Sequence, residues 1–124
     1  MLKDRAPRVL KLLAQLGLEG MVFLDLANIR YLCGFSGTDG ALVVQGERSW
    51  FLTDSRYVTQ AHGQVTAGEI IEYRVKSDGI LTCLKNQGIR KVGFEADTLP
   101  YATVQEFREK SGEQMEWSHI TLRI

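Results

Sequence analysis

A short hairpin of two apolar strands constrains the fold of this chain more than any other feature of its sequence. Residues 41–44 are apolar without interruption, residues 49–53 centre on a second apolar run, and residues 45–48 have the composition of a hairpin turn. Hairpin strands are antiparallel, and apolar runs without polar alternation indicate a sheet that is covered on both faces. The hairpin therefore predicts a sheet that contains an antiparallel pair and lies between other layers.

Helical and strand-like segments alternate on both sides of the hairpin. The first helix has an apolar stripe from Ala6 to Leu16, begins near Asp4 and ends at Gly17. Residues 25–34 fit either a short helical turn or a loop. Further strands are expected at residues 21–24, 69–73, 91–94 and 115–117. The pattern predicts an α/β domain with a mixed sheet of about six strands flanked by helices.

Three further helices are placed by their capping residues. Asp54 or Ser55 is expected to cap a helix over residues 56–64, and Ser77 or Asp78 a helix that ends at Gly88. The last helix is expected to begin at residues 98–100 and to end at Gly112. Its predicted apolar face consists of Tyr101, Val104 and Phe107.

A balanced composition argues against several classes of partner. The chain has 124 residues, enough for one domain, with 15 Lys+Arg against 15 Asp+Glu. A neutral chain does not attract nucleic acid or anionic lipid, so we expect neither nucleic acid nor a membrane as a partner. The charged N-terminus does not resemble a signal peptide, and Cys33 and Cys83 stand far apart without a C-x-x-C motif. We therefore expect a reduced, cytoplasmic protein.

Motifs for catalysis or metal binding are missing or incomplete. Ser36 lies in a glycine-rich loop, but the second glycine of G-x-S-x-G is displaced by one residue, and neither His62 nor His119 has an adjacent acid. That loop leads into a strand and matches no phosphate-binding fingerprint. Asp39 and Asp54 flank the hairpin and can approach each other, but two carboxylates alone seldom hold a transition metal. We predict no catalytic residue and no metal ligand in this chain.

The most pointed polar segment is residues 53–57, T-D-S-R-Y, where a strand ends and a helix opens. Polar residues at such a junction often mark the ligand edge of an α/β sheet. The alternative is purely structural, with Asp54 as a helix cap and Arg56 paired to a nearby carboxylate.

Two motifs in tandem resemble those of Xaa-Pro aminopeptidases and Xaa-Pro dipeptidases, members of the creatinase/prolidase family. Residues 28–37, N-I-R-Y-L-C-G-F-S-G, resemble N-x-R-Y-L-T-G-F-x-G, and residues 53–61, T-D-S-R-Y-V-T-Q-A, resemble T-D-x-R-Y-x-x-Q-A. Downstream, residues 92–95 resemble V-G-x-[DE], and residues 122–124 resemble the junction with a following domain.

The resemblance implies that residues 1–124 form a creatinase/prolidase-type N-terminal domain with a ribonuclease H-like mixed sheet. In the family a C-terminal "pita-bread" domain, absent from this chain, holds two divalent metals, manganese or cobalt, that activate water for hydrolysis of the Xaa-Pro bond. The expected partners are that catalytic domain, a second copy in a homodimer, and Xaa-Pro peptides. This chain alone is expected to be inactive and to hold no cofactor.

By residue match, the resemblance also implies substrate contacts. Arg56 is the first candidate, because a guanidinium suits a substrate carboxylate or carbonyl. Phe35 would form an apolar wall, and Ser36 and Asp39 would be polar contacts. Two alternatives remain. The chain could be a protein-binding or chaperone-type domain of an inactive pita-bread homologue, or part of an amidinohydrolase acting on creatine.

Overall fold

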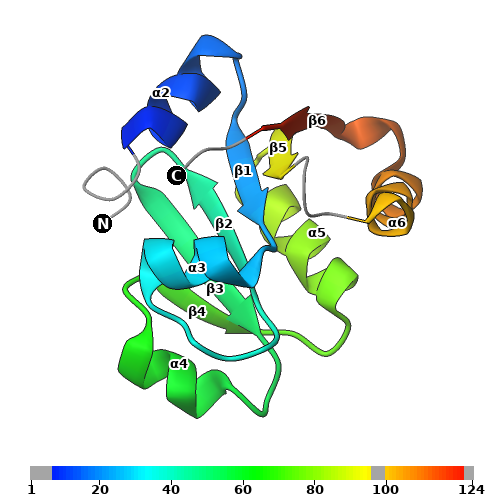
Figure 1. Ribbon diagram of the computed structural model, residues 1–124. Coiled ribbons are helices and arrows are strands. Elements are labelled where there is room, and N and C mark those ends of the chain that lie inside the picture. Colours follow the sequence, from blue (N-terminus) through cyan, green and yellow to red (C-terminus); the bar gives the residue numbers. More distant parts are fainter. Residues whose placement is uncertain (1–6, 96–99, 122–124) are drawn as a thin grey trace.

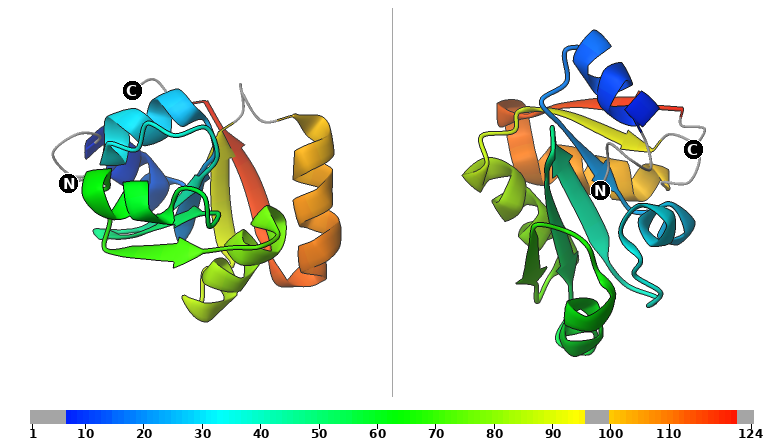
Figure 2. Two further views of the ribbon diagram at one scale, coloured as in Figure 1. Left: turned by 90° about the horizontal axis from the view of Figure 1, so that it is seen from below. Right: turned by 90° about the vertical axis from the view of Figure 1, so that its left-hand side faces the viewer.

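The fold is a six-stranded sheet between two layers of helices (Figures 1 and 2). The computed structural model describes residues 7–95 and 100–121. Its strands are β1 (Gly20–Phe23), β2 (Ala41–Gln45), β3 (Arg48–Thr53), β4 (Glu69–Glu72), β5 (Lys91–Glu95) and β6 (Glu116–Ile120). Its helices are α2 (Pro7–Gln15), α3 (Leu26–Cys33), α4 (Val58–Gln64), α5 (Lys76–Asn86) and α6 (Tyr101–Ser111), followed by the 3₁₀ turn η1 (Gly112–Gln114).

The sheet is mixed because one strand runs against the others. The strand order is β4-β3-β2-β1-β5-β6, and β2 pairs antiparallel with both β1 and β3. The pairs β1/β5, β3/β4 and β5/β6 are parallel. The predicted hairpin is confirmed, with Gln45 opposite Arg48 at its turn, and the strand predicted at residues 69–73 forms the β4 edge.

The two faces of the sheet carry separate halves of the hydrophobic core. Side chains of β2 alternate between them, so that Leu42 packs with α2, α3 and α4, whereas Val43 packs with α5 and α6. This arrangement confirms that both faces of the hairpin are covered. Cys33 and Cys83 lie in opposite halves of the core, and no disulfide joins them.

Residues 25–34, which fitted either a helical turn or a loop, form helix α3 and its two caps. Asp25 accepts a hydrogen bond from the backbone N–H of Asn28 at 3.1 Å, which satisfies a donor in the first turn. Gly34 ends the helix with φ at 88°, a left-handed conformation that glycine adopts without a steric cost. These caps determine where the glycine-rich loop begins.

The predicted cap of the helix at residues 56–64 was wrong. The helix α4 begins at Val58 and has no side-chain cap. The Asp54 carboxylate instead accepts the backbone N–H of Arg56 at 2.9 Å and pairs with the Arg56 guanidinium, so it holds a turn before the helix.

Two other helix predictions also needed correction. Helix α5 begins at Lys76, which places Ser77 and Asp78 inside its first turn rather than at the cap. In α6, Phe107 is buried as expected, but Tyr101, which is the first residue of the helix, is 76% exposed and does not belong to the buried face. The predicted helix start at Asp4, residues 98–99 and the junction at residues 122–124 lie outside the described residues.

No helix within the described residues is long and apolar enough to cross a membrane.

Candidate functional site

Polar side chains gather along the side of the sheet that carries the carboxyl ends of β1, β3, β4 and β5 and the start of β2. We refer to this side as the carboxyl-end edge. At two places on this edge, neighbouring parallel strands lead to helices on opposite faces. The strands β1 and β5 lead to α3 and α6, and β3 and β4 lead to α4 and α5. We call these places the β1/β5 and β3/β4 switch points. Ligands of α/β proteins commonly bind at such points, beyond the carboxyl ends of the strands.

The β1/β5 switch point is occupied by the carboxylate of Glu95, which is only 4% exposed. Its Oε1 accepts the backbone N–H groups of Leu24 at 2.5 Å and Asp25 at 2.9 Å. Its Oε2 accepts Nδ2 of Asn28 at 2.7 Å. The chain thus supplies its own anion to the start of α3, and this carboxylate joins β5 to the β1–α3 connection.

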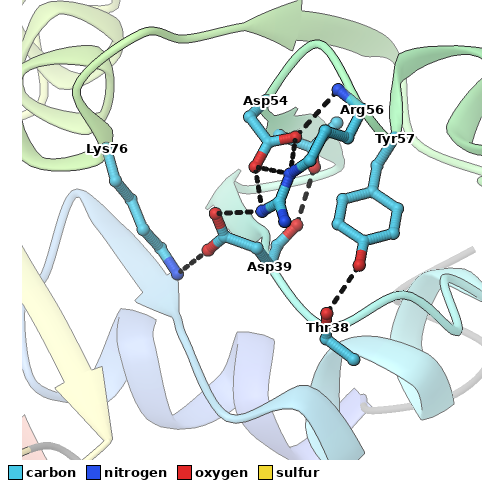
Figure 3. A network of polar contacts seen from close by, with 7 residues as sticks. Thr38, Asp39, Asp54, Arg56, Tyr57 and Lys76 are labelled. Atoms are coloured by element: carbon cyan, nitrogen blue, oxygen red, sulfur yellow. Dashed lines mark hydrogen bonds and ion pairs between the residues drawn. The ribbon is translucent and has the colours of Figure 1, made fainter.

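The β3/β4 switch point carries a chain of alternating charges (Figure 3). The Arg56 guanidinium donates to Asp54 from both Nε and Nη2, with Nη2 2.6 Å from Oδ2. The same Nη2 lies 3.9 Å from Oδ2 of Asp39, and Lys76 Nζ lies 2.8 Å from Oδ1 of Asp39. Three segments far apart in the sequence therefore meet in one network of two carboxylates and two cations.

The charges of this network stabilise one another while Arg56 stays accessible. The hydrogen bond from Arg56 lowers the pKa of Asp54, and the same bond raises the pKa of Arg56. The side chain of Arg56 is 67% exposed, and its guanidinium also lies 5.1 Å from the centroid of the Tyr57 ring. An exposed guanidinium between two carboxylates can exchange one of them for a ligand carboxylate at little cost.

The glycine-rich loop, residues 34–40, is fastened to β3 and α4 by side chains. Gln64 accepts the backbone N–H of Ser36 at 3.1 Å and donates to its Oγ at 2.9 Å. Further along the loop, Thr38 Oγ1 and Tyr57 Oη are 2.6 Å apart, and Thr53 Oγ1 donates to the Asp39 carbonyl at 2.6 Å. The loop is therefore held in a defined position before any ligand arrives.

Below the loop, the ring of Phe35 is 1% exposed and packs 4.5 Å from Phe51 and 5.7 Å from Tyr57, measured between ring centroids. A side chain at Gly37 would collide with the Phe35 ring, because an ideal Cβ there would lie 2.2 Å from Cζ. The loop backbone at residue 37 therefore passes so close to the Phe35 ring that only glycine fits there.

A pocket of about 500 Å³ opens beside Lys76, between the end of β1 and the first turns of α5 and α6. Leu24 and Phe107 are among its apolar lining, whereas Asp25 and Ser77 contribute polar groups. Lys76 lines this pocket and also pairs with Asp39, so the pocket adjoins the charged network.

The structure brings together some of the predicted site residues and separates others. Arg56 and Asp39 meet in the charged network, and the predicted approach of Asp39 and Asp54 is confirmed through their shared contact with Arg56. Ser36 is exposed on the same loop but bonds to the amides of Gln60 and Gln64. Phe35 lies in the core below that loop, so in this structure its ring is not open to a ligand.

Sequence reasoning missed Lys76 and Tyr73, which complete the β3/β4 switch point. Both follow the edge strand β4, in a segment that has no recognisable motif. The parallel pairing of β3 with β4 brings this segment to the switch point, where Lys76 pairs with Asp39 and the Tyr73 N–H donates to the Thr53 carbonyl. Within residues 7–95 and 100–121, no group of three or more His, Cys, Asp or Glu side chains is arranged to hold a metal.

Comparison with known proteins gives consistent matches. The sequence matches the family described as "Creatinase/Prolidase N-terminal domain" over residues 5–123. The "Uncharacterized peptidase YqhT" of Bacillus subtilis is 36% identical over 101 residues, which cover 77% of this chain and 28% of that protein.

Solved structures with the same fold include both whole chains and separate domains. An Xaa-Pro dipeptidase from Bacillus anthracis superposes with a TM-score of 0.87 at 29% identity, over 98% of this chain and 34% of its own. An Xaa-Pro aminopeptidase structure from Streptococcus pyogenes gives 0.85 at 29% identity, over 97% of this chain and 92% of its own. The N-terminal domain of the cytoplasmic peptidase PepQ from Mycobacterium tuberculosis H37Rv gives 0.85 at 30% identity, over 95% and 93%.

Proposed function

The chain belongs to the creatinase/prolidase N-terminal domain family, and from this premise we propose that it is the non-catalytic N-terminal domain of a proline-specific metallopeptidase, an Xaa-Pro dipeptidase or aminopeptidase. Its relatives of known structure include an Xaa-Pro dipeptidase and an Xaa-Pro aminopeptidase. The chain spans 34% of the length of the first and 28% of that of the YqhT peptidase. The parent protein would carry its catalytic domain in the remaining length.

The metals of the reaction would belong to that catalytic domain. Two divalent ions, manganese or cobalt, would activate the water that attacks the Xaa-Pro bond. Within the described part of this chain, no group of three or more His, Cys, Asp or Glu side chains is arranged to hold a metal. In this proposal the role of the chain is binding and orientation.

The observation that carries this proposal is the accessible guanidinium of Arg56 at the β3/β4 switch point. It is held between Asp54 and Asp39 but remains 67% exposed, and its planar donors suit a carboxylate or carbonyl of a peptide. Asp39 and Ser36, on the fastened loop beside it, would provide further polar contacts. Phe35 would contribute from below, by supporting the loop as its buried anchor.

The same edge would close part of the substrate cleft, and the domain would take part in a homodimer. A loop that is already fixed by hydrogen bonds at Ser36, Thr38 and Asp39 can form a wall of a cleft without an ordering cost on binding. We place the parent in the cytoplasm, as the PepQ relative is described.

The direct test compares this chain with the longest protein that contains it. Both would be assayed for release of the residue that precedes proline, with and without added manganese. Activity confined to the longer protein is the expected result. Activity of this chain alone would overturn the assignment and would place the chemistry near Ser36, Asp39 and Asp54. If neither protein cleaves, a protein-binding domain becomes the better description.

A further inference from the structure

Large apolar side chains that remain exposed gather around the pocket between the end of β1 and the first turns of α5 and α6. Three of the five such side chains in the described part of the chain lie there. Val75 lines the pocket and is 52% exposed. Leu26 and Tyr101 directly follow two other lining residues, Asp25 and Pro100. Single exposed apolar residues are common on proteins, but a group of them around one hollow marks an interaction surface.

The three charged side chains among the described lining of this pocket already have partners within the chain. Lys76 Nζ lies 2.8 Å from Asp39, and the Asp25 carboxylate caps α3. Glu106 accepts a hydrogen bond from Ser77 Oγ at 2.9 Å. A partner that covers the pocket therefore buries no charge that lacks a counterpart, which would be costly. This chemistry suits an apolar protein surface rather than a charged small molecule.

The last strand of the sheet ends beside this pocket. Strands β5 and β6 run parallel and adjacent (Figure 1), and Ile120 at the end of β6 lies opposite Glu95 at the end of β5. The Glu95 carboxylate accepts the backbone N–H groups of Leu24 and Asp25, and both of these residues line the pocket. Neighbouring strands are about 4.8 Å apart, so a segment that continues from β6 begins close to the pocket.

We propose that this pocket and its apolar rim, Leu26, Val75 and Tyr101, form the surface on which the catalytic domain of the parent protein docks. The inference rests on the proposed function, which assigns a catalytic domain to the length of the parent beyond this chain. An apolar side chain of that domain would fill the pocket. Because Lys76 lines the pocket and also pairs with Asp39, docking there would fix the charged network relative to the catalytic centre.

The first measurement is hydrogen–deuterium exchange of this chain alone and within the full-length protein, both without a peptide. The N–H groups in the first turn of a helix have no partner inside the helix, and Val75 provides no side-chain cap for α5. They should exchange fast in this chain alone, and about tenfold or more slowly where a docked domain excludes water. We expect this slowing at residues 26–27, 76–78 and 101–102. Residues 16–17, before β1, should exchange equally in both samples.

Matched substitutions separate docking from folding. Val75→Glu and Tyr101→Glu place a charge on the apolar rim, and Leu16→Glu places the same charge on a similarly exposed side chain before β1. In this chain alone, all three variants should unfold close to the wild-type midpoint, because the substituted side chains are exposed. In the full-length protein, the two rim variants should lose the slowed exchange, since docking would bury their charge. Leu16→Glu should keep it.

The possible results separate this inference from the proposed function. Fast exchange at the rim of a full-length protein that cleaves Xaa-Pro peptides would overturn the inference alone. Slowing that appears in this chain alone as its concentration rises would also overturn it, by placing a second copy on the rim. Slowing only after a peptide is added would make the pocket a ligand site instead. Slowed exchange in a full-length protein without Xaa-Pro activity would overturn the proposed function, while the following domain would still dock there.

Discussion

The two switch points of this sheet hold the same kind of group, a carboxylate, in opposite ways. At the β1/β5 switch point, Glu95 is buried and accepts two backbone N–H groups and one side-chain amide. At the β3/β4 switch point, Asp39 and Asp54 are paired with the cations Arg56 and Lys76 near the surface. The carboxylate at the first switch point is buried, whereas solvent can reach the carboxylates and cations at the second.

The difference shows how one fold can use one switch point for stability and keep the other for binding. Removing a buried carboxylate leaves several donors without partners inside the protein, which is strongly destabilising. Surface ion pairs contribute little to folding, because water and salt replace them readily. A ligand can therefore displace a partner of Arg56, while displacing Glu95 would disrupt the start of α3.

The largest effect is expected when the Glu95 carboxylate is removed from the β1/β5 switch point. Glu95→Ala should lower the free energy of unfolding by about 3 kcal/mol, because the N–H groups of Leu24 and Asp25 and the Asn28 amide lose their acceptor. Glu95→Gln keeps one acceptor oxygen and should lose markedly less. Denaturant unfolding of both variants measures the difference, and equal, small losses would refute a structural role for this carboxylate.

At the β3/β4 switch point we expect a smaller effect, on peptide cleavage rather than on stability. Arg56→Ala in the full-length protein should lower kcat/KM for Xaa-Pro peptides about tenfold, while leaving the unfolding midpoint close to that of the wild type. Arg8→Ala, an exposed arginine on α2 far from this edge, serves as the matched control. Unchanged kinetics in Arg56→Ala, or a large loss of stability, would make Arg56 a structural residue.

The smallest effect concerns alkaline pH. Burial and the Asp39 charge raise the pKa of Tyr73 in the folded chain, whereas the unfolded phenol ionises near about pH 10. Above that pH the unfolded state releases a proton that the folded state retains, so the free energy of unfolding falls as pH rises. Unfolding midpoints measured at about pH 8 and about pH 10.5 should differ less in Tyr73→Phe than in the wild type. The same difference in both proteins would contradict the assigned environment of Tyr73.

Most of the fold could be predicted from the sequence because its signals are local. The apolar runs of β2 and β3, the turn at Gly46 and the stop at Gly17 each act within a few residues. The predicted helix starts were less accurate. Asp54 is a residue type that often caps helices, but its carboxylate accepts hydrogen bonds from Arg56, two residues later. The sequence alone does not show whether a carboxylate will cap a helix or pair with a nearby cation instead.

The candidate site was only half predictable, because its parts are joined by strand pairing rather than by motif. Arg56 and Asp39 stand in segments with a recognisable pattern. Lys76 and Tyr73 follow the edge strand β4, and no local feature marks them; their position depends on the register in which Thr53 lies opposite Glu72. The sequence alone did not decide whether Phe35 is buried, since its partners Phe51 and Tyr57 lie in other segments.

The comparison of the two switch points is tested most directly by hydrogen–deuterium exchange of the full-length protein with and without a non-hydrolysable Xaa-Pro peptide. We expect the peptide to slow exchange at residues 36–39, 54–57 and 73–76, around the charged network. Residues 24–28, which Glu95 already holds, should exchange at the same rate in both samples. Equal slowing at the two switch points, or slowing at residues 24–28 alone, would contradict it.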